Sequence, residues 1–220
     1  MSHLTKPHFF PRLVIACTFL LLGKLTDAGA IASPMHTCAV TETNDTYPCV
    51  VGKNGIRADK KEGDGATPAG RFLIREIFYR PDKLSTQEMA AVNAMRRKGF
   101  RVNALTQDDA WVDDVHSPDY NRQIQLSAFK NTLPSHENLW QTDDAYDLVA
   151  VLGYNDDPII KGKGSAIFMH IARQTPAGTY KPTVGCIALS KHDLLKIFEA
   201  LTPKTRVDIS EKSSVILYRS

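Results

Sequence analysis

Short apolar runs divide the second half of the chain, and their length constrains the fold more than any other feature. Three runs cover residues 147–154, 166–171 and 186–189, and two more cover residues 206–209 and 214–218. All are shorter than the roughly ten residues of a typical helix. They are rich in branched side chains and bounded by Gly, Pro and polar residues, which is typical of buried strands. The sequence therefore predicts a sheet, with the last two strands paired to each other.

Two helices are expected beside this sheet, because each begins at a capping residue. Ser85 and Glu88 have the spacing of a capping box, which predicts a helix running to about Lys98. Ser190 can cap a second helix, and Pro203 ends it. Both helices carry enough apolar residues to pack on a sheet.

The middle of the chain adds further strands. Residues 72–79 and 124–129 are expected to be strands, whereas residues 106–122 are aromatic and acidic without a clear period. The predicted fold class is therefore mainly β, a β-rich α+β protein with two sizeable helices.

The first 32 residues differ from the rest and have the layout of a secretory signal peptide. Lys6 and Arg12 form a basic start, residues 13–22 are apolar, and small residues at 28–32 offer a cleavage site. An uncleaved N-terminal membrane anchor is the alternative, although the apolar run is short for a transmembrane span. We expect residues 33–220 to form a single domain that is exported to the periplasm or cell envelope.

The charge pattern indicates neither a nucleic-acid partner nor a metal site. The formal net charge is +3 at pH 7, and the short basic cluster at 96–98 fits a solvated helix end. His36 and Cys38 are isolated and His192 falls on a helix, whereas a zinc site needs about four closely placed ligands. We therefore expect no metal and no other cofactor.

Export makes the cysteine count informative. Cys17 falls in the signal segment, which leaves Cys38, Cys49 and Cys186. Cys38 and Cys49 flank a turn signal at 44–45, so they can form a disulfide across a hairpin in an oxidising compartment. We then expect Cys186 to be the unpaired thiol, retained for chemistry or buried as a packing residue.

Cys186 follows a glycine and lies sixteen residues after His170, an imidazole that can take the thiol proton. The backbone N–H groups of Gly185 and Cys186 can stabilise an oxyanion. A third group should orient the imidazole, and a backbone carbonyl near Ile171 is a candidate. The alternative for His170 is a satisfied core histidine at the end of a strand.

Three segments together resemble one family. They are Thr67-Pro68-x-Gly70-x-Phe72, residues 164–170 with His170, and residues 182–189 with Cys186. They are similar to the first strand, the histidine strand and the nucleophile segment of the L,D-transpeptidase catalytic domain, also called the YkuD-type domain. The resemblance runs from about residue 50 to residue 201. It implies a mixed β-sandwich in which Cys186 is the nucleophile and His170 is the base.

The resemblance also implies a substrate class. Members of this family act on peptidoglycan stem peptides, where the thiolate attacks the carbonyl at the L-centre of diaminopimelate. The thioester then passes to an amine of another stem, which is transpeptidation, or to water. The alternative enzyme activity is therefore that of an L,D-carboxypeptidase or another peptidoglycan amide hydrolase.

This chain departs from the common pattern of the family around the nucleophile. Val184 stands where the pattern has a second histidine, Ala188 stands where Arg or Asn is usual, and the loop from His170 to Cys186 is a few residues short. These departures favour an alternative of another class, a non-catalytic cell-wall-binding domain.

Further substrate-binding candidates depend less on motifs. Tyr180 can place its hydroxyl near the oxyanion, or it can pack within its loop. Thr183 is a candidate because it lies just before the Gly-Cys pair. Asn155 can contact the substrate, or its side chain can stabilise a turn. A polar and aromatic cluster can bind the zwitterionic end of a stem peptide or pack as a loop, and packing is favoured. The cluster consists of Trp111, Asp113, Asp114, Tyr120 and Asn121.

Overall fold

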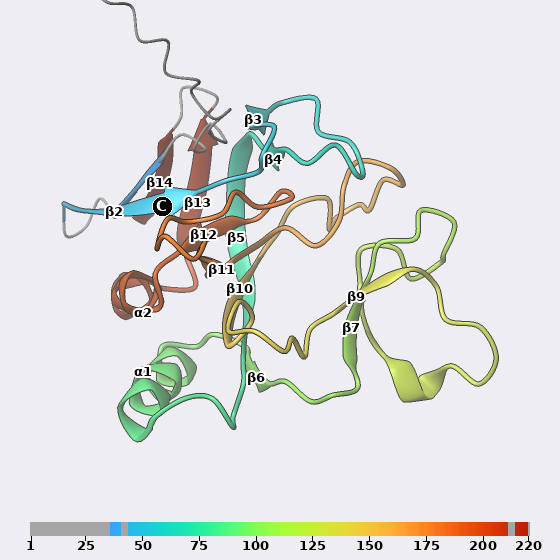
Figure 1. Ribbon diagram of the computed structural model, residues 1–220, viewed down its shortest axis with the longest axis horizontal. Helices are drawn as coiled ribbons and strands as arrows, with labels where there is room; N and C mark the ends of the chain where they lie inside the picture. The colour runs from blue at the N-terminus through green and yellow to red at the C-terminus, as the bar shows by residue number, and fades with distance from the viewer. Residues whose placement is uncertain (1–35, 41–43, 211–213, 220) are drawn as a thin grey trace, which may run out of the picture. The chain divides into compact units, whose positions relative to one another are not determined.

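A computed structural model describes residues 36–40, 44–210 and 214–219 (Figure 1). The expected signal segment, residues 1–32, lies outside the described residues, as does Cys17. Among the described residues, no helix is long and apolar enough to cross a membrane. The elements, in chain order, are β1 (His36–Val40), β2 (Asp45–Val50), β3 (Ile56–Arg57), β4 (Thr67–Pro68), β5 (Gly70–Tyr79), α1 (Thr86–Arg97), β6 (Val102–Ala104), β7 (Asp109–Val112), β8 (Gln123–Gln125), the 3-10 helix η1 (Leu126–Ala128), β9 (His136–Asn138), β10 (Leu148–Leu152), β11 (Phe168–Ile171), β12 (Ile187–Leu189), α2 (Lys191–Ala200), β13 (Thr205–Ser210) and β14 (Ser214–Arg219).

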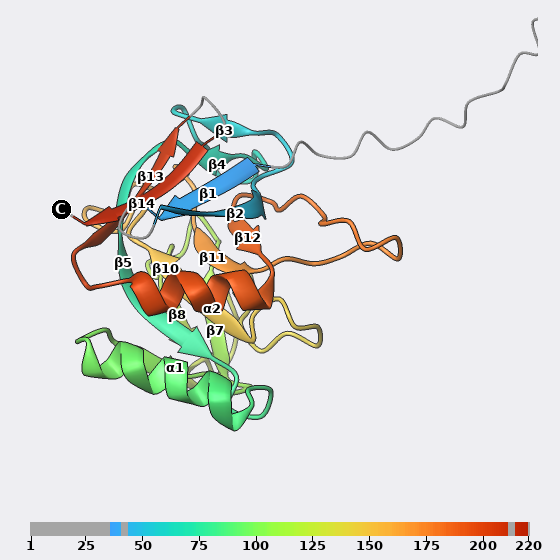
Figure 2. The ribbon, with the colours of Figure 1, turned by 90° about the vertical axis from the view of Figure 1, so that its left-hand side faces the viewer.

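One large mixed sheet carries most of these strands. Its order is β10-β11-β12-β2-β1-β14-β13-β5-β6, and β10 also pairs with β5, so the sheet closes on itself (Figure 2). Three of its pairings are parallel, β1 with β14, β11 with β12, and β5 with β6. The described residues form more strand than helix and include two helices, which confirms the predicted mainly β, α+β fold class.

The long strand β5 makes this closure possible, because its two parts face different neighbours. Gly70–Leu73 pairs with β13, and Ile74–Tyr79 pairs with β10. The register shifts between Val151 and Leu152 of β10, an irregularity that bends a sheet locally. The ring of strands encloses fully buried side chains such as Ile77 and Met169. Burying each such side chain stabilises the fold by about 1.5–3 kcal/mol.

The two helices begin where their capping residues predict. Ser85 accepts a hydrogen bond from the N–H of Glu88, and the Glu88 side chain accepts one from the N–H of Ser85. Ser190 caps α2 by accepting from the N–H of Asp193. The helices lie side by side (Figures 1 and 2), and α2 also contacts β11.

A separate small sheet was largely missed by the sequence analysis. Its order is β8-β7-β9, and β7 lies inside the region 106–122 for which no period was found. The strand expected at 124–129 is wrong from residue 126 onward, because β8 ends at Gln125 and η1 follows it. Strands of three or four residues are too short to show an alternating pattern, which explains these errors. Trp111 of β7 packs edge-on against Phe168 of β11, with ring centroids 5.1 Å apart.

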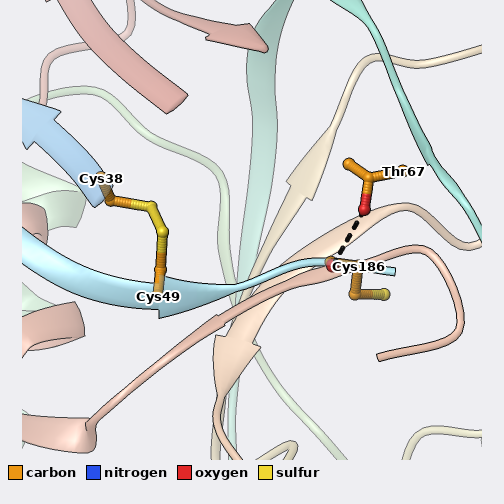
Figure 3. Close-up of a disulfide and its surroundings, with 4 residues drawn as sticks. All are labelled: Cys38, Cys49, Thr67 and Cys186. Carbon is orange, nitrogen blue, oxygen red and sulfur yellow. Dashed lines mark hydrogen bonds between the residues drawn. A yellow bond between two sulfur atoms is a disulfide. The ribbon is translucent and has the colours of Figure 1, made fainter. Parts of the chain in front are cut away.

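A disulfide joins Cys38 of β1 to Cys49 of β2, with Cα atoms 5.9 Å apart (Figure 3). Both sulfur-bearing side chains are fully buried in the main core. Cys186 is the free cysteine of the described residues, and Figure 3 shows it apart from the disulfide at the start of β12.

Candidate active site

The parallel pairing of β11 with β12 brings the thiol and the imidazole to one face of the sheet. Met169 pairs with Ile187, and His170 pairs with Ala188. Side chains two residues apart on a strand point to the same face, so Cys186 lies on the face that carries Ala188 and His170. The two residues are therefore diagonal neighbours, although sixteen residues separate them in the sequence.

Both side chains line one pocket of about 420 Å³. Its other lining residues come from several parts of the chain: Lys60, Glu62 and Gly63; Asp113, His136, Glu137 and Tyr146; Ser165–Ile167; Arg173; residues 181–185; and Ala188. Cys186 is 8% exposed and His170 is 4% exposed, so each reaches the pocket with only a small part of its surface.

The thiol of Cys186 is neutral in this environment. It donates to the carbonyl oxygen of Ala166 at 3.2 Å and accepts from the N–H of Phe168 at 3.4 Å. Burial, with a smaller contribution from the negative charge of Glu137, raises the pKa of Cys186 to about 12. Ala166 has φ of 52°, an uncommon conformation for a residue with a side chain, and such strain is frequent at functional sites.

His170 is held by its backbone neighbour. Nδ1 lies 2.8 Å from the carbonyl oxygen of Ile171, the carbonyl that the sequence analysis considered for this purpose. The carbonyl can only accept, so Nδ1 carries the hydrogen and Nε2 is free to accept a proton. Burial lowers the pKa of His170 to about 4. The edge of the Tyr146 ring packs on the imidazole, with centroids 5.1 Å apart.

Two threonine hydroxyls hold the backbone carbonyl of Cys186. Thr183 Oγ1 donates to the carbonyl oxygen of Cys186 at 2.6 Å, and Thr67 Oγ1 donates to the same oxygen at 3.4 Å (Figure 3). Gly185 has φ of 153°, and a Cβ there would lie 3.1 Å from the carbonyl oxygen of Ala66. The Gly-Cys turn therefore requires glycine at this position.

Comparison with known families agrees with this geometry. The sequence profile of YkuD, the L,D-transpeptidase catalytic domain, matches residues 35–209. The chain belongs to the L,D-transpeptidase catalytic domain family. Searches of curated proteins and of solved structures found no match. Family membership supports an L,D-transpeptidase type of function, and it supports peptidoglycan as the substrate.

In this L,D-transpeptidase domain, only one of the three predicted substrate-binding residues lines the pocket. Thr183 lines the pocket, but its hydroxyl already binds the backbone. It donates to the carbonyl oxygen of Cys186 and accepts from the N–H of Gly185 at 3.2 Å. Tyr180 is partly buried against the cluster of Val50, Ala172 and Ala188, and it is not among the pocket-lining residues. Asn155 also lies outside that lining, and its side chain binds the backbone of Ile160.

The polar and aromatic cluster is mostly packed, as the favoured interpretation predicted. Trp111, Tyr120 and Asn121 are buried, and Asn121 accepts from the indole N–H of Trp111 at 2.9 Å. Asp113 is the exception, because it lines the pocket. Of the five residues in the cluster, one therefore adjoins the candidate active site of this L,D-transpeptidase domain.

Two residues of this L,D-transpeptidase site carried no signal in the sequence. Glu137 lies in β9, and Tyr146 precedes β10, and both line the pocket. The Tyr146 hydroxyl donates to Glu137 Oε1 at 2.6 Å. Neither residue belongs to a motif, and only the fold of the small sheet brings them to Cys186.

Proposed function

We propose that this protein is a cysteine acyltransferase that acts on peptidoglycan stem peptides, forming a thioester at the L-centre of diaminopimelate. The observation that carries this proposal is that Cys186 and His170 come from two family segments and face one pocket from adjacent parallel strands. The pocket has a volume of about 420 Å³, and its rim is open to solvent at Val184, which is 70% exposed.

The first half-reaction begins from a neutral thiol and a neutral imidazole. The thiol turns from the Ala166 carbonyl to His170 Nε2, and its proton passes to the imidazole as the sulfur–carbon bond forms. The carbonyl electron pair moves onto oxygen and then returns as the carbon–nitrogen bond breaks. The imidazolium gives its proton to the departing amine of D-alanine, which leaves the acyl group on Cys186.

The second half-reaction transfers this acyl group. An amine of a second stem attacks the thioester, its proton passes to His170, and the thiol is restored as the sulfur–carbon bond breaks. Water in place of the amine gives L,D-carboxypeptidase activity by the same steps. The acceptor alone separates the two activities, and both need the same Cys186 and His170.

Backbone N–H groups supply the oxyanion donors in this proposal. The Gly185 N–H donates to the Thr183 hydroxyl in the resting structure, so it must leave this partner to reach the oxyanion. The Cys186 N–H lies beside the reacting sulfur and serves as the second donor. Because a backbone donor needs no particular side chain, valine at 184 is compatible with this role.

Export to the periplasm or cell envelope completes the proposal. It is supported by the signal-like residues 1–32 and by the disulfide between Cys38 and Cys49, since disulfides persist in oxidising compartments. If residues 1–32 are not cleaved, they would act as a membrane anchor. Residues 33–220 would then form the catalytic domain.

Incubation with a disaccharide-tetrapeptide and mass analysis of the products tests the proposal. A crosslinked dimer with release of D-alanine indicates transpeptidation, and a tripeptide product indicates L,D-carboxypeptidation. Cys186→Ala should abolish both products. If the parent protein and Cys186→Ala are indistinguishable, both enzyme activities are excluded, and binding to intact peptidoglycan then tests the non-catalytic cell-wall-binding alternative.

A further inference from the structure

The small sheet presents two carboxylates to the pocket from one of its faces. Trp111 of β7 pairs with Glu137 of β9, so their side chains share a face. Asp113 follows Trp111 by two residues and therefore lies on the same face as Glu137. That face packs on the main sheet through Trp111 and Phe168, and both carboxylates line the pocket that contains Cys186.

Both carboxylates keep acceptor capacity that no described residue uses. Glu137 accepts from Tyr146 through Oε1, and no described side chain donates to its Oε2. Asp113 Oδ1 is buried from solvent and has no hydrogen-bond partner among the described residues. A buried carboxylate oxygen without a donor is costly unless a ligand or ion satisfies it.

The cations around the pocket do not satisfy these carboxylates. Lys60 donates to Asp64 at 2.6 Å, and Arg173 donates to Asp143 at 2.6 Å, so each has a closer partner. Lys181 lines the pocket from an exposed position on its rim. Burial raises the pKa of Glu137, and the charge of Arg173 opposes that rise without a hydrogen bond between the two side chains. A cation that binds Glu137 or Asp113 directly must therefore come from outside the described residues.

Glu137 also opposes the chemistry that Cys186 has to perform. Its negative charge adds to burial in raising the pKa of the thiol, and burial raises the pKa of Glu137 itself. A carboxylate in the same pocket as a nucleophilic thiol disfavours the thiolate unless a cation compensates it. A positively charged group bound at Glu137 removes this opposition at the moment when substrate is present.

We propose that Glu137, with Asp113 beside it, is a specificity-determining subsite that binds an ammonium group of the stem-peptide substrate and holds it beside Cys186. This inference rests on the proposed function and deepens it. Two ammonium groups have the required chemistry, that on the D-centre of the diaminopimelate in the acyl donor and the protonated acceptor amine. The acceptor would pass one proton to Glu137 before the neutral amine attacks the thioester. In either case the N–H groups of the bound ammonium donate to Asp113 Oδ1 and Glu137 Oε2, which accept no hydrogen bond from the described residues.

Glu137→Gln tests the subsite with little disturbance, because glutamine keeps the size of the side chain and can still accept from Tyr146. Glu199→Gln, on the exposed surface of α2, is the matched control. In the full-length protein without substrate, Glu137→Gln should raise the rate at which iodoacetamide labels Cys186 by about three- to tenfold, the effect of half to one pKa unit. The control should leave this rate unchanged.

The same variant should have the opposite effect on the substrate. If the acyl donor supplies the ammonium group, release of D-alanine from the native tetrapeptide should fall tenfold or more, whereas release from a tetrapeptide acetylated at the D-centre amine should not fall. Asp113→Asn should weaken the native reaction in the same direction. A loss of folding would instead expose Cys186, raise iodoacetamide labelling far more than tenfold and abolish both donor reactions. A general loss of packing would lower the reactions of the native and the acetylated donor equally, and that result would overturn the inference.

Separate assays of the two half-reactions identify the source of the ammonium group. If the donor supplies it, Glu137→Gln slows D-alanine release without any acceptor. If the acceptor supplies it, D-alanine release persists, crosslinked dimer falls, and tripeptide rises. Equal rates for Glu137→Gln and the parent in every assay would overturn the subsite alone, whereas a parent protein that releases no D-alanine from any donor refutes the proposed function and the subsite with it.

Discussion

Cys186 should react very slowly with iodoacetamide at neutral pH, with a rate that rises steeply as the pH increases. The thiolate is the reactive species, and a pKa of about 12 leaves a thiolate fraction of about 10⁻⁴ at pH 8. An unperturbed cysteine, with a pKa of about 8.5, is about one quarter thiolate at that pH. The thiolate fraction of Cys186 is therefore about 2,000-fold smaller.

The shape of the pH profile separates this neutral pair from a preformed ion pair. Because His170 has its pKa lowered to about 4 by burial, it is neutral throughout the range from pH 6 to pH 10. The labelling rate should then rise about tenfold per pH unit across that range without a plateau. A thiolate–imidazolium pair would instead give a rate that is high and nearly constant from about pH 5 to pH 8.

Mass spectrometry of the peptide that contains Cys186 measures this rate, since it separates that thiol from Cys17. Cys38 and Cys49 are joined and should stay unlabelled. His170→Asn should show nearly the same labelling profile, because a neutral imidazole does little for the free thiol, yet it should lose D-alanine release. A pH-independent rate in the parent protein, abolished by His170→Asn, would refute the reasoning.

Three other changes test separate parts of the structure. Burial lowers the pKa of His170 from about 6.5 in the unfolded chain to about 4 in the folded protein. Folding is therefore most favourable above pH 6.5, where the imidazole is neutral in both states, and the free energy of unfolding should fall by about 3 kcal/mol as the pH decreases to 4. Denaturant titrations should show this loss in the parent and not in His170→Asn. Cys38→Ser with Cys49→Ser should lower the free energy of unfolding by about 2–3 kcal/mol, since the bond closes a loop across a separation of 11 residues; an unchanged value would contradict the pairing. Gly185→Ala should lower the melting temperature more than Gly178→Ala, because a Cβ at Gly185 would lie 3.1 Å from the carbonyl oxygen of Ala66 and a Cβ at Gly178 meets nothing within 4 Å. Equal decreases in melting temperature would show that close packing does not require glycine at position 185.

Local chemistry made much of the fold predictable. Ser85 and Ser190 determine where the helices begin, because their hydroxyls satisfy N–H groups within the next turn. The hairpin that joins Cys38 to Cys49 follows from a turn signal between two strand-like runs. In each case the interacting residues are close in the sequence, so the pattern is visible without the fold.

The environment of the candidate site depended on longer-range contacts and was not predictable. Glu137 belongs to a three-residue strand with no visible period, and it reaches the pocket only because β9 pairs with β7. The engagement of the Gly185 N–H by Thr183 depends on the conformation of a single turn. The sequence pointed to Cys186 and His170 as the proposed reacting pair, but not to the charges that surround them.

The pairing of β1 with β14 has a consequence for how the chain assembles. These strands come from opposite ends of the described chain, and they lie next to each other in parallel within the closed sheet. Contacts between such distant segments must overcome a large entropy of loop closure, which slows folding. We expect the ring of strands to close only after β14 has been released. Refolding kinetics of a protein truncated before β14 would test this order, and a truncated protein that folds at the full rate would exclude it.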